Sequence, residues 1–291
     1  GEVVRFFFTN VSNTRTFNLS FDGAPMKLVG TDVGNFEREE WIESLVIAPA
    51  ERYIVHVKFP RDGNYQVLNG VQGIDHIAGQ FFSDVDTIGV IRTGPGPALP
   101  DLVASFEALR ANRAARDEIN NYRPFFDLPI DKTLILDMTS NDLPLVVERL
   151  MTVDSSYFHP IEWSGTMPMM NLMATPNEVS WVLREQGTGL ENEEIDWKFK
   201  VGDIVKLRIR NRRETLHQMQ HPIHIHGQRF LVLAVNGVEN ENFAWKDTAL
   251  VPVGGTLDIL LELSNPGRWM LHCHIAEHLE AGMKMVFTVD G

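Results

Sequence analysis

Residues 245–271, WKDTALVPVGGTLDILLELSNPGRWML, match residues 41–67, WIESLVIAPAERYIVHVKFPRDGNYQV, without a gap. Trp41 and Trp245 are 204 residues apart, and so are Gly63 and Gly267. Upstream of these stretches, MKLVGTDVG and RFLVLAVNG correspond at nearly the same spacing. Similarity at a fixed spacing over this length indicates two copies of one domain. We call them the first copy and the second copy.

Both copies contain short runs that are rich in β-branched and aromatic residues. VVRFFFTN and ERYIVHVKF lie in the first copy, and DIVKLRIRN and TLDILLEL lie in the second. Turn sequences such as RDGN and SNPG bound these runs. This pattern is typical of antiparallel sandwiches, so we predict an all-β protein built from two Greek-key β-sandwich domains.

The segment between the two copies begins with a stretch rich in glycine and proline and continues with a helical pattern. Asp101 follows Pro100 and is a suitable N-cap. Apolar residues then recur along one helix face, namely Leu102, Phe106 and Leu109. We expect one helix that connects the copies along a domain surface. The predicted divisions of the chain are 1–95, 96–129 and 130–291.

The composition excludes several classes of partner and site. The formal net charge is -13 and the isoelectric point is about 5.2, so nucleic acid and anionic membrane surfaces would repel the chain. No apolar run approaches the roughly 18 residues of a membrane span, and the start, GEVVRFFFTN, has no signal-peptide pattern. The single cysteine excludes an internal disulfide framework.

Six of the ten histidines and the only cysteine lie in two short motifs of the second copy. The motif HPIHIHG contains His221, His224 and His226. The motif HCHIAEH contains His272, Cys273, His274 and His278. In the first copy, TFNLSFDG and VLNG stand at the corresponding places. Only the second copy therefore has the side chains of a metal site.

Strand geometry divides these side chains into two sets. If MLHCHI is a strand, His272 and His274 point to one face and Cys273 to the other. His224 and His226 share a face by the same rule, whereas the proline after His221 allows that side chain to point elsewhere. The first predicted set is His224, His226, His272 and His274, and the second is His221, Cys273 and His278.

The second set has the ligand composition of a blue-copper electron-transfer site, with Met283 available as a weak axial thioether. The thiol of Cys273 would then bind copper, and its two flanking histidines would connect that copper to a second metal centre. Tetrahedral zinc is the alternative for a set of histidines and one cysteine. Seven potential ligands and a methionine exceed what one zinc ion can use.

Other residues with metal-binding or polar side chains have weaker patterns. The isolated histidines, to which we assign no role, are His56, His76, His159 and His217. The segment TMPMMNLM, residues 166–173, could bind cuprous ion or fill a core. Asp247 and Glu277 are candidates to orient imidazole ligands, and a solvated carboxylate is the alternative for each.

The motifs HPIHIHG and HCHIAEHLEAGM closely resemble the two C-terminal copper signatures of multicopper oxidases, especially bacterial laccase-like enzymes of the three-domain type. The resemblance covers the whole chain. The part from about residue 130 onward resembles the third cupredoxin domain, and RFFFTNVSNTRTFNLSFDG through LVIAPAERYIVHVKF resembles the copper-free middle domain. It implies that both sandwiches are cupredoxin-like.

The resemblance also implies a role for each residue of the motifs. The type 1 copper ligands would be His221, Cys273, His278 and Met283. The type 2 copper would bind His224, and the type 3 pair would bind His226, His272 and His274. The intact enzyme would hold four copper ions and couple one-electron oxidation of phenolic, aromatic or metal-ion donors to reduction of dioxygen to water. Electrons would pass from Cys273 through His272 and His274.

Two departures from the family pattern affect the prediction. The family's trinuclear cluster takes four further histidines from HxH pairs of an N-terminal cupredoxin domain, and this chain has no other HxH pair. We therefore expect a C-terminal fragment whose partner is that domain, in the same polypeptide or as a cleaved piece. Leu279 replaces an acidic residue of several bacterial relatives, and the acid is Glu280, so proton delivery is not assigned.

Two other functions remain compatible with these residues. In a blue-copper electron-transfer or copper-handling module, the type 1 site would work without oxygen reduction. A two-domain oxidase or nitrite reductase would build a cluster between subunits, but it needs histidines from the first copy, and TFNLSFDG has none. The family resemblance places the protein in the periplasm or outside the cell.

Overall fold

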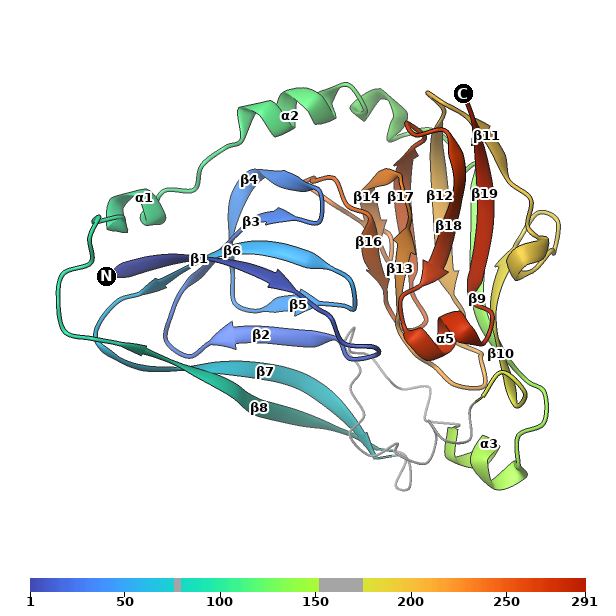
Figure 1. Cartoon of the computed structure of the whole chain (residues 1–291), viewed down its shortest axis with the longest axis horizontal. Helices are drawn as coiled ribbons and strands as arrows, with labels where there is room; N and C mark the ends of the chain where they lie inside the picture. Colours follow the sequence, from blue (N-terminus) through green and yellow to red (C-terminus); the bar gives the residue numbers. More distant parts are fainter. Residues whose placement is uncertain (76–79, 152–174) are drawn as a thin grey trace.

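The computed structural model describes residues 1–75, 80–151 and 175–291. Figure 1 shows two groups of strands side by side, with helical segments of the linker running along both. His76, His159 and the methionine-rich segment 166–173 lie outside the described residues. The all-β prediction is confirmed, because strands dominate both copies.

The first copy is a pair of four-stranded sheets, with strand orders β1-β6-β3-β4 and β5-β2-β7-β8. Its buried aliphatic and aromatic residues form one core, in which the rings of Phe6, Phe21 and Phe59 contact one another. The strands are β1 (Glu2–Thr9), β2 (Phe17–Phe21), β3 (Met26–Thr31), β4 (Gly34–Ile42), β5 (Leu45–Ile47), β6 (Arg52–Phe59), β7 (Gly63–Asp75) and β8 (Gln80–Thr93).

The second copy pairs a six-stranded sheet, ordered β10-β9-β12-β17-β14-β15, with a five-stranded sheet, ordered β11-β19-β18-β13-β16. Its strands are β9 (Lys132–Ser140), β10 (Val179–Glu185), β11 (Lys198–Lys200), β12 (Ile204–Asn211), β13 (His221–Ile225), β14 (Arg229–Val235), β15 (Val238–Glu239), β16 (Thr248–Val251), β17 (Thr256–Glu262), β18 (Gly267–Cys273) and β19 (Lys284–Asp290). The short helices are α3 (Leu145–Met151), η2 (Asn192–Glu194) and α5 (Ala276–Glu280).

The structure confirms the internal repeat strand by strand. β2 and β13, β6 and β17, and β7 and β18 each begin 204 residues apart. Their neighbours also agree, because β5-β2-β7 in the first copy corresponds to β16-β13-β18 in the second. Phe17 therefore stands where the second copy has His221, and Asn69 stands where it has Cys273. The two copies share a backbone plan and differ in the side chains at the positions of the predicted metal ligands.

The linker contains helix, as predicted, but the expectation of one continuous helix is wrong. The segment forms α1 (Val103–Glu107), α2 (Arg113–Asn120) and the 3-10 turn η1 (Arg123–Phe125), and Ala108 is extended. The backbone of Arg110 and Asn112 instead hydrogen-bonds to Glu39 and Glu37 at the edge of β4. These tertiary hydrogen bonds, with the Arg110–Glu39 ion pair, outweigh local helix propensity.

The caps and the apolar face of the linker also differ in part from the prediction. Leu102, and not Asp101, is the N-cap residue of α1, although the Asp101 carboxylate still accepts a hydrogen bond from the Val103 amide. Phe106 is buried, whereas Leu102 and Leu109 are exposed. Ile119 of α2 packs with apolar side chains of the second copy. The domain limits at 95 and 130 stay predictions.

In the described part of the chain, no helix is long and apolar enough to cross a membrane.

A buried histidine of the first copy gives a pH-dependent prediction. Arg5 Nε donates to His56 Nε2 at 2.8 Å, and burial together with that guanidinium lowers the pKa of His56 below 6.5. Below pH 6.5 the unfolded chain therefore binds a proton that the folded chain resists, so stability falls as pH falls. The free energy of unfolding should drop more between pH 7 and pH 5 in wild type than in His56→Gln. Urea denaturation of the two metal-free proteins at pH 7 and at pH 5 measures this drop. An equal drop in both proteins would contradict the prediction.

Candidate metal centre

The two histidine motifs lie on adjacent strands of the five-stranded sheet. β13 and β18 pair antiparallel, with Ile223 opposite Cys273 and His224 opposite His272. Ile223 and Cys273 belong to the core of the second copy, so their neighbours along each strand point to the other face. The sheet therefore carries metal-binding side chains on both faces, as strand alternation predicts.

The first group, which we call the thiol cluster, consists of His221, Cys273 and His278. All three side chains are buried. The two Nδ1 atoms lie 3.1 Å apart, and Cys273 Sγ lies 3.7 Å from His221 Nδ1 and 3.5 Å from His278 Nδ1. β13, β18 and α5 contribute one residue each. The three potential donor atoms thus converge on one point.

Those distances suit a metal ion. A circle through three points with these separations has a radius of about 2.0 Å, within a few tenths of an ångström of ordinary metal–imidazole and metal–thiolate bonds. Met283 is also buried, and its backbone hydrogen-bonds to those of Cys273 and His278. Two imidazoles, a thiolate and a neighbouring methionine are the donor set of a blue-copper site.

Burial sets the protonation states in the thiol cluster. It lowers the pKa of His221 to about 3 and that of His278 well below its ordinary value, so both rings are neutral and keep a lone pair. It also raises the pKa of the Cys273 thiol. A thiolate is unfavourable here unless a cation binds beside it, so metal binding and thiol deprotonation are coupled.

Trp181 on β10 packs against this cluster, which the sequence did not indicate. Its indole stacks on the His278 ring with 3.6 Å between centroids and meets the His221 ring edge-on at 5.5 Å. Only 5% of Trp181 is exposed. The ring therefore restricts both imidazoles and excludes water from one side. No local motif surrounds Trp181, so only the fold could reveal this contact.

The second group, the histidine cluster, consists of His224, His226, His272 and His274. Ligand atoms of the first three lie within 4.8 Å of one another, and His226 Nε2 is 3.0 Å from His272 Nε2. The His274 ring lies 5.5 Å from the His272 ring and 5.8 Å from the His224 ring, between centroids. His226 is exposed and His272 is buried, so the cluster opens on one side.

Hydrogen bonds orient two of these rings. His272 Nδ1 donates to the Cys273 carbonyl oxygen at 2.7 Å. His224 Nδ1 lies 3.0 Å from the Asp247 carbonyl oxygen and 2.9 Å from Thr248 Oγ1. Because a carbonyl oxygen only accepts, both Nδ1 atoms carry the proton, and both Nε2 atoms keep their lone pairs. Burial lowers the pKa of His272 to about 4, and that of His226 and His274 also falls.

Among the two carboxylates proposed to orient ligands, Asp247 does contact a histidine. Its Oδ1 accepts from Thr248 Oγ1 at 2.8 Å and lies 3.5 Å from His224 Nδ1. Glu277 instead accepts a hydrogen bond from Thr14 Oγ1, at 3.0 Å, in the first copy. Glu280 is exposed.

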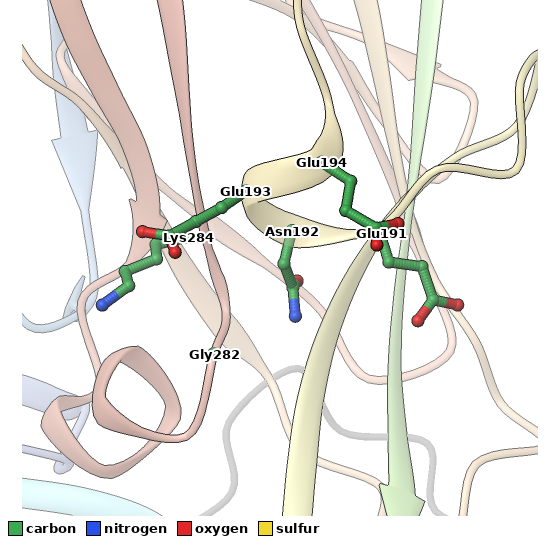
Figure 2. Close-up of a pocket in the computed structure, with 6 residues that line it drawn as sticks. All are labelled: Glu191, Asn192, Glu193, Glu194, Gly282 and Lys284. Carbon is green, nitrogen blue, oxygen red and sulfur yellow. The ribbon is translucent and has the colours of Figure 1, made fainter.

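Figure 2 shows a cleft in the second copy. Its lining residues are Glu191, Asn192, Glu193, Glu194, Gly282 and Lys284. Asn192 Nδ2 donates to the Trp181 carbonyl oxygen, and Gly282 directly precedes Met283. The cleft is therefore one residue from the predicted axial ligand, and three of its side chains are carboxylates.

Comparison with known proteins identifies the family of this chain. Residues 144–291, just over half of the chain, match the family model described as multicopper oxidase, and residues 1–95 match a second model with the same description. The chain belongs to the multicopper oxidase family. Members of this family bind copper, so copper is the metal that the two clusters should be tested for.

Individual relatives agree with the family. A laccase of Neurospora crassa is 22% identical over 99% of this chain and 47% of its own length. Laccase-8 of Oryza sativa is 36% identical over 32% of the chain and 19% of its own length. Among solved structures, a multicopper oxidase from Campylobacter jejuni, titled a metallo-oxidase, aligns with a TM-score of 0.67 at 22% identity, covering 99% of this chain and 53% of that one. The chain thus spans about half the length of the Neurospora laccase and of the Campylobacter enzyme.

These matches also confirm the predicted fold class, two cupredoxin-like Greek-key sandwiches. In the described residues, both groups of potential metal ligands lie in the second copy. The described residues of the first copy therefore offer no group of metal ligands for a cluster shared between subunits, as a two-domain enzyme would need.

Proposed function

We propose that the chain is the part of a laccase-like multicopper oxidase that accepts electrons and passes them toward dioxygen. The observation that carries this proposal is the position of Cys273. Its side chain belongs to the buried thiol cluster, while the adjacent His272 belongs to the histidine cluster on the opposite sheet face. One strand thus joins two potential metal sites covalently.

Each set of side chains has a role in the proposed reaction. Bound copper would supply one-electron redox chemistry in both clusters. His221, Cys273, His278 and Met283 would hold the type 1 ion and exclude water from it. His224 would hold the type 2 ion, and the type 3 pair would take His226, His272 and His274. Electrons would leave through the Cys273 thiolate and the flanking His272 and His274.

The histidine cluster needs further ligands for oxygen reduction. Four histidines cannot fill the coordination of three copper ions, and the open side at His226 leaves room for more. We propose that an N-terminal cupredoxin domain, in the same polypeptide or as a separate piece, supplies them. Dioxygen and a small reducing substrate would be the other partners, and the family resemblance favours the periplasm or the extracellular space.

The cleft in Figure 2 supports a class of reducing substrate. Glu191, Glu193 and Glu194 line it, with Lys284 as the one cation among its lining residues. Carboxylates attract cations and repel anions. We therefore expect neutral phenols and cationic aromatic amines or metal ions to be better donors than anionic ones.

Oxygen uptake tests the proposed activity. Copper-loaded protein that contains this chain together with its N-terminal cupredoxin domain should consume one dioxygen for every four electrons withdrawn from a phenolic donor. His272→Gln should lower the rate by at least about a hundredfold, since the change removes a ligand and part of the electron path. The control His56→Gln should keep the wild-type rate. No oxygen uptake with phenols, aromatic amines or cuprous ion would contradict the proposal and favour an electron-transfer module.

A further inference from the structure

A series of hydrogen bonds connects the contact between the two copies to a histidine of the histidine cluster. Arg52 begins β6 of the first copy, and its guanidinium forms two hydrogen bonds with the Asp247 carboxylate, at 2.7 and 2.6 Å. Such two-point pairs fix geometry better than a single contact does. Asp247 precedes β16, beside β13, so this pair joins the metal-free copy to the edge of the site.

From Asp247 the hydrogen bonds continue to the ligand. Thr248 Oγ1 donates to Asp247 Oδ1 at 2.8 Å and accepts from His224 Nδ1 at 2.9 Å. The Thr248 hydroxyl has one proton, and it donates that proton in the hydrogen bond to the carboxylate. The hydroxyl oxygen therefore faces the imidazole as an acceptor. This direction favours the His224 tautomer protonated at Nδ1 and leaves Nε2 as the metal-binding atom.

Asp32 of the first copy holds the same backbone from a second side. Its fully buried carboxylate accepts from the backbone N–H groups of Asp247 and Thr248, both at 3.3 Å, and from that of Arg52 at 2.9 Å. Both ends of the Arg52–Asp247 pair are therefore tied to one carboxylate. A buried acceptor with several donors tolerates little movement, since each broken bond leaves a buried polar group unsatisfied.

We propose that the first copy, which carries none of the predicted ligands, acts as the positioning element of the histidine cluster: Arg52 and Asp32 hold Asp247 and Thr248, which fix the tautomer and orientation of His224. Arg52 and Asp32 are positioning residues, because they act on the metal ligand through other side chains. The inference rests on the proposed function only in that His224 is a copper ligand.

The first test uses metal-free protein and is therefore independent of copper loading. Nitrogen–proton correlation spectra of ¹⁵N-histidine-labelled chain, with His224→Gln to assign the signal, report which ring nitrogen carries the proton. Wild type should show His224 protonated at Nδ1, with slow solvent exchange. Thr248→Val conserves the side-chain shape and leaves the Asp247 carbonyl oxygen as the remaining acceptor for His224 Nδ1. Arg52→Gln and Thr248→Val should therefore speed proton exchange at His224 Nδ1 by about tenfold or more.

The matched control is Arg38→Gln. Arg38 also joins the two copies, through its side-chain contact with the Glu241 carbonyl oxygen and its backbone contact with Asn242. Among the described residues, its hydrogen bonds and ion pairs go to Glu40, Glu241 and Asn242 and none goes to the histidine cluster, so its loss weakens the interface alone. Its spectrum at His224 should match that of wild type.

The second test measures the affinity of the copper ion that binds outside the thiol cluster and therefore gives no copper–thiolate absorption band. Competition with a chelator gives this affinity. Loss of a hydrogen bond behind a histidine ligand typically weakens metal binding 10–100-fold. Arg52→Gln and Thr248→Val should show that loss, while the copper–thiolate band of Cys273 and the copper affinity of Arg38→Gln stay unchanged.

Two outcomes overturn the positioning role. One is a wild-type tautomer and exchange rate in both Arg52→Gln and Thr248→Val, and the other is an equal change in Arg38→Gln. If Arg52→Gln does not fold, Thr248→Val decides the question. If wild type binds no copper at all, the proposed function fails, and the spectra of metal-free protein still decide the positioning role.

Discussion

Cys273→Ser should abolish the intense visible absorption that copper gives with the wild-type chain. That band requires a thiolate bound to copper, and Cys273 is the only cysteine of the sequence. The substitution is nearly isosteric, and the site is fully buried, so His221 and His278 keep their places. A serine hydroxyl is a far poorer copper ligand, so we expect the type 1 ion to be lost or bound at least about a hundredfold more weakly. Absorption spectra and copper content of reconstituted protein measure both effects.

The internal repeat provides the control for this substitution. Asn69 of the first copy occupies the place of Cys273, is buried as well, and accepts a hydrogen bond from the Asn18 backbone. Asn69→Ser makes a comparable polar substitution at the corresponding strand position without touching the thiol cluster. It should keep the full absorption band. A band that survives in Cys273→Ser would show that the thiol is not a copper ligand.

Lys246→Met should destabilise the folded chain by about 3–5 kcal/mol, because it removes the buried cation that Asp32 and Glu51 share. Lys246 Nζ lies 3.1 Å from Asp32 Oδ2 and 3.2 Å from Glu51 Oε1, and at most 9% of each of the three side chains is exposed. Although burial alone would lower it, contacts with Tyr53, Glu51 and Asp32 raise the pKa of Lys246. The ammonium is therefore charged in the folded protein at neutral pH. Urea denaturation of metal-free protein measures the loss.

Two further variants separate charge from packing. Lys198 forms an exposed ion pair with Asp196, so Lys198→Met should hardly change stability. Adding Glu51→Gln to Lys246→Met should recover part of the loss, since it removes one of the uncompensated charges. A loss below about 1 kcal/mol in Lys246→Met would mean that this buried network does not hold the two copies together.

Much of the candidate site could be predicted because it depends on local rules. Strand periodicity assigns Cys273 to one sheet face and His272 to the other. The predicted strand through His274 is too long, because β18 ends at Cys273, so the place of His274 follows from the structure and not from periodicity. The fixed spacing of Trp41 and Trp245 likewise revealed the repeat, since equivalent strands occupy equivalent places in both copies. The antiparallel pairing of the two motif-bearing strands places His224 opposite His272 and Ile223 opposite Cys273, whereas His278 joins the thiol cluster from α5.

The remaining features depend on contacts between distant segments. Arg52 and Asp247 are 195 residues apart, and neither residue alone suggests a pair. Trp181 stacks on His278 only because β10, the edge strand of the six-stranded sheet, lies next to the segment that follows α5, where the Trp181 amide donates to the Ala281 carbonyl oxygen. The linker helix breaks where β4 offers hydrogen bonds to Arg110 and Asn112. A sequence pattern predicts which face a side chain uses, whereas these features require knowing what lies opposite.

The most direct test of the central claim, that one strand joins two copper sites, is a crystal structure of the copper-loaded chain with anomalous diffraction measured at the copper edge. The account predicts one peak bonded to His221, Cys273 and His278, and at least one more among His224, His226 and His272 on the opposite face. A strong peak in the histidine cluster with none beside Cys273, or a zinc signal in place of copper at the thiol, would contradict it.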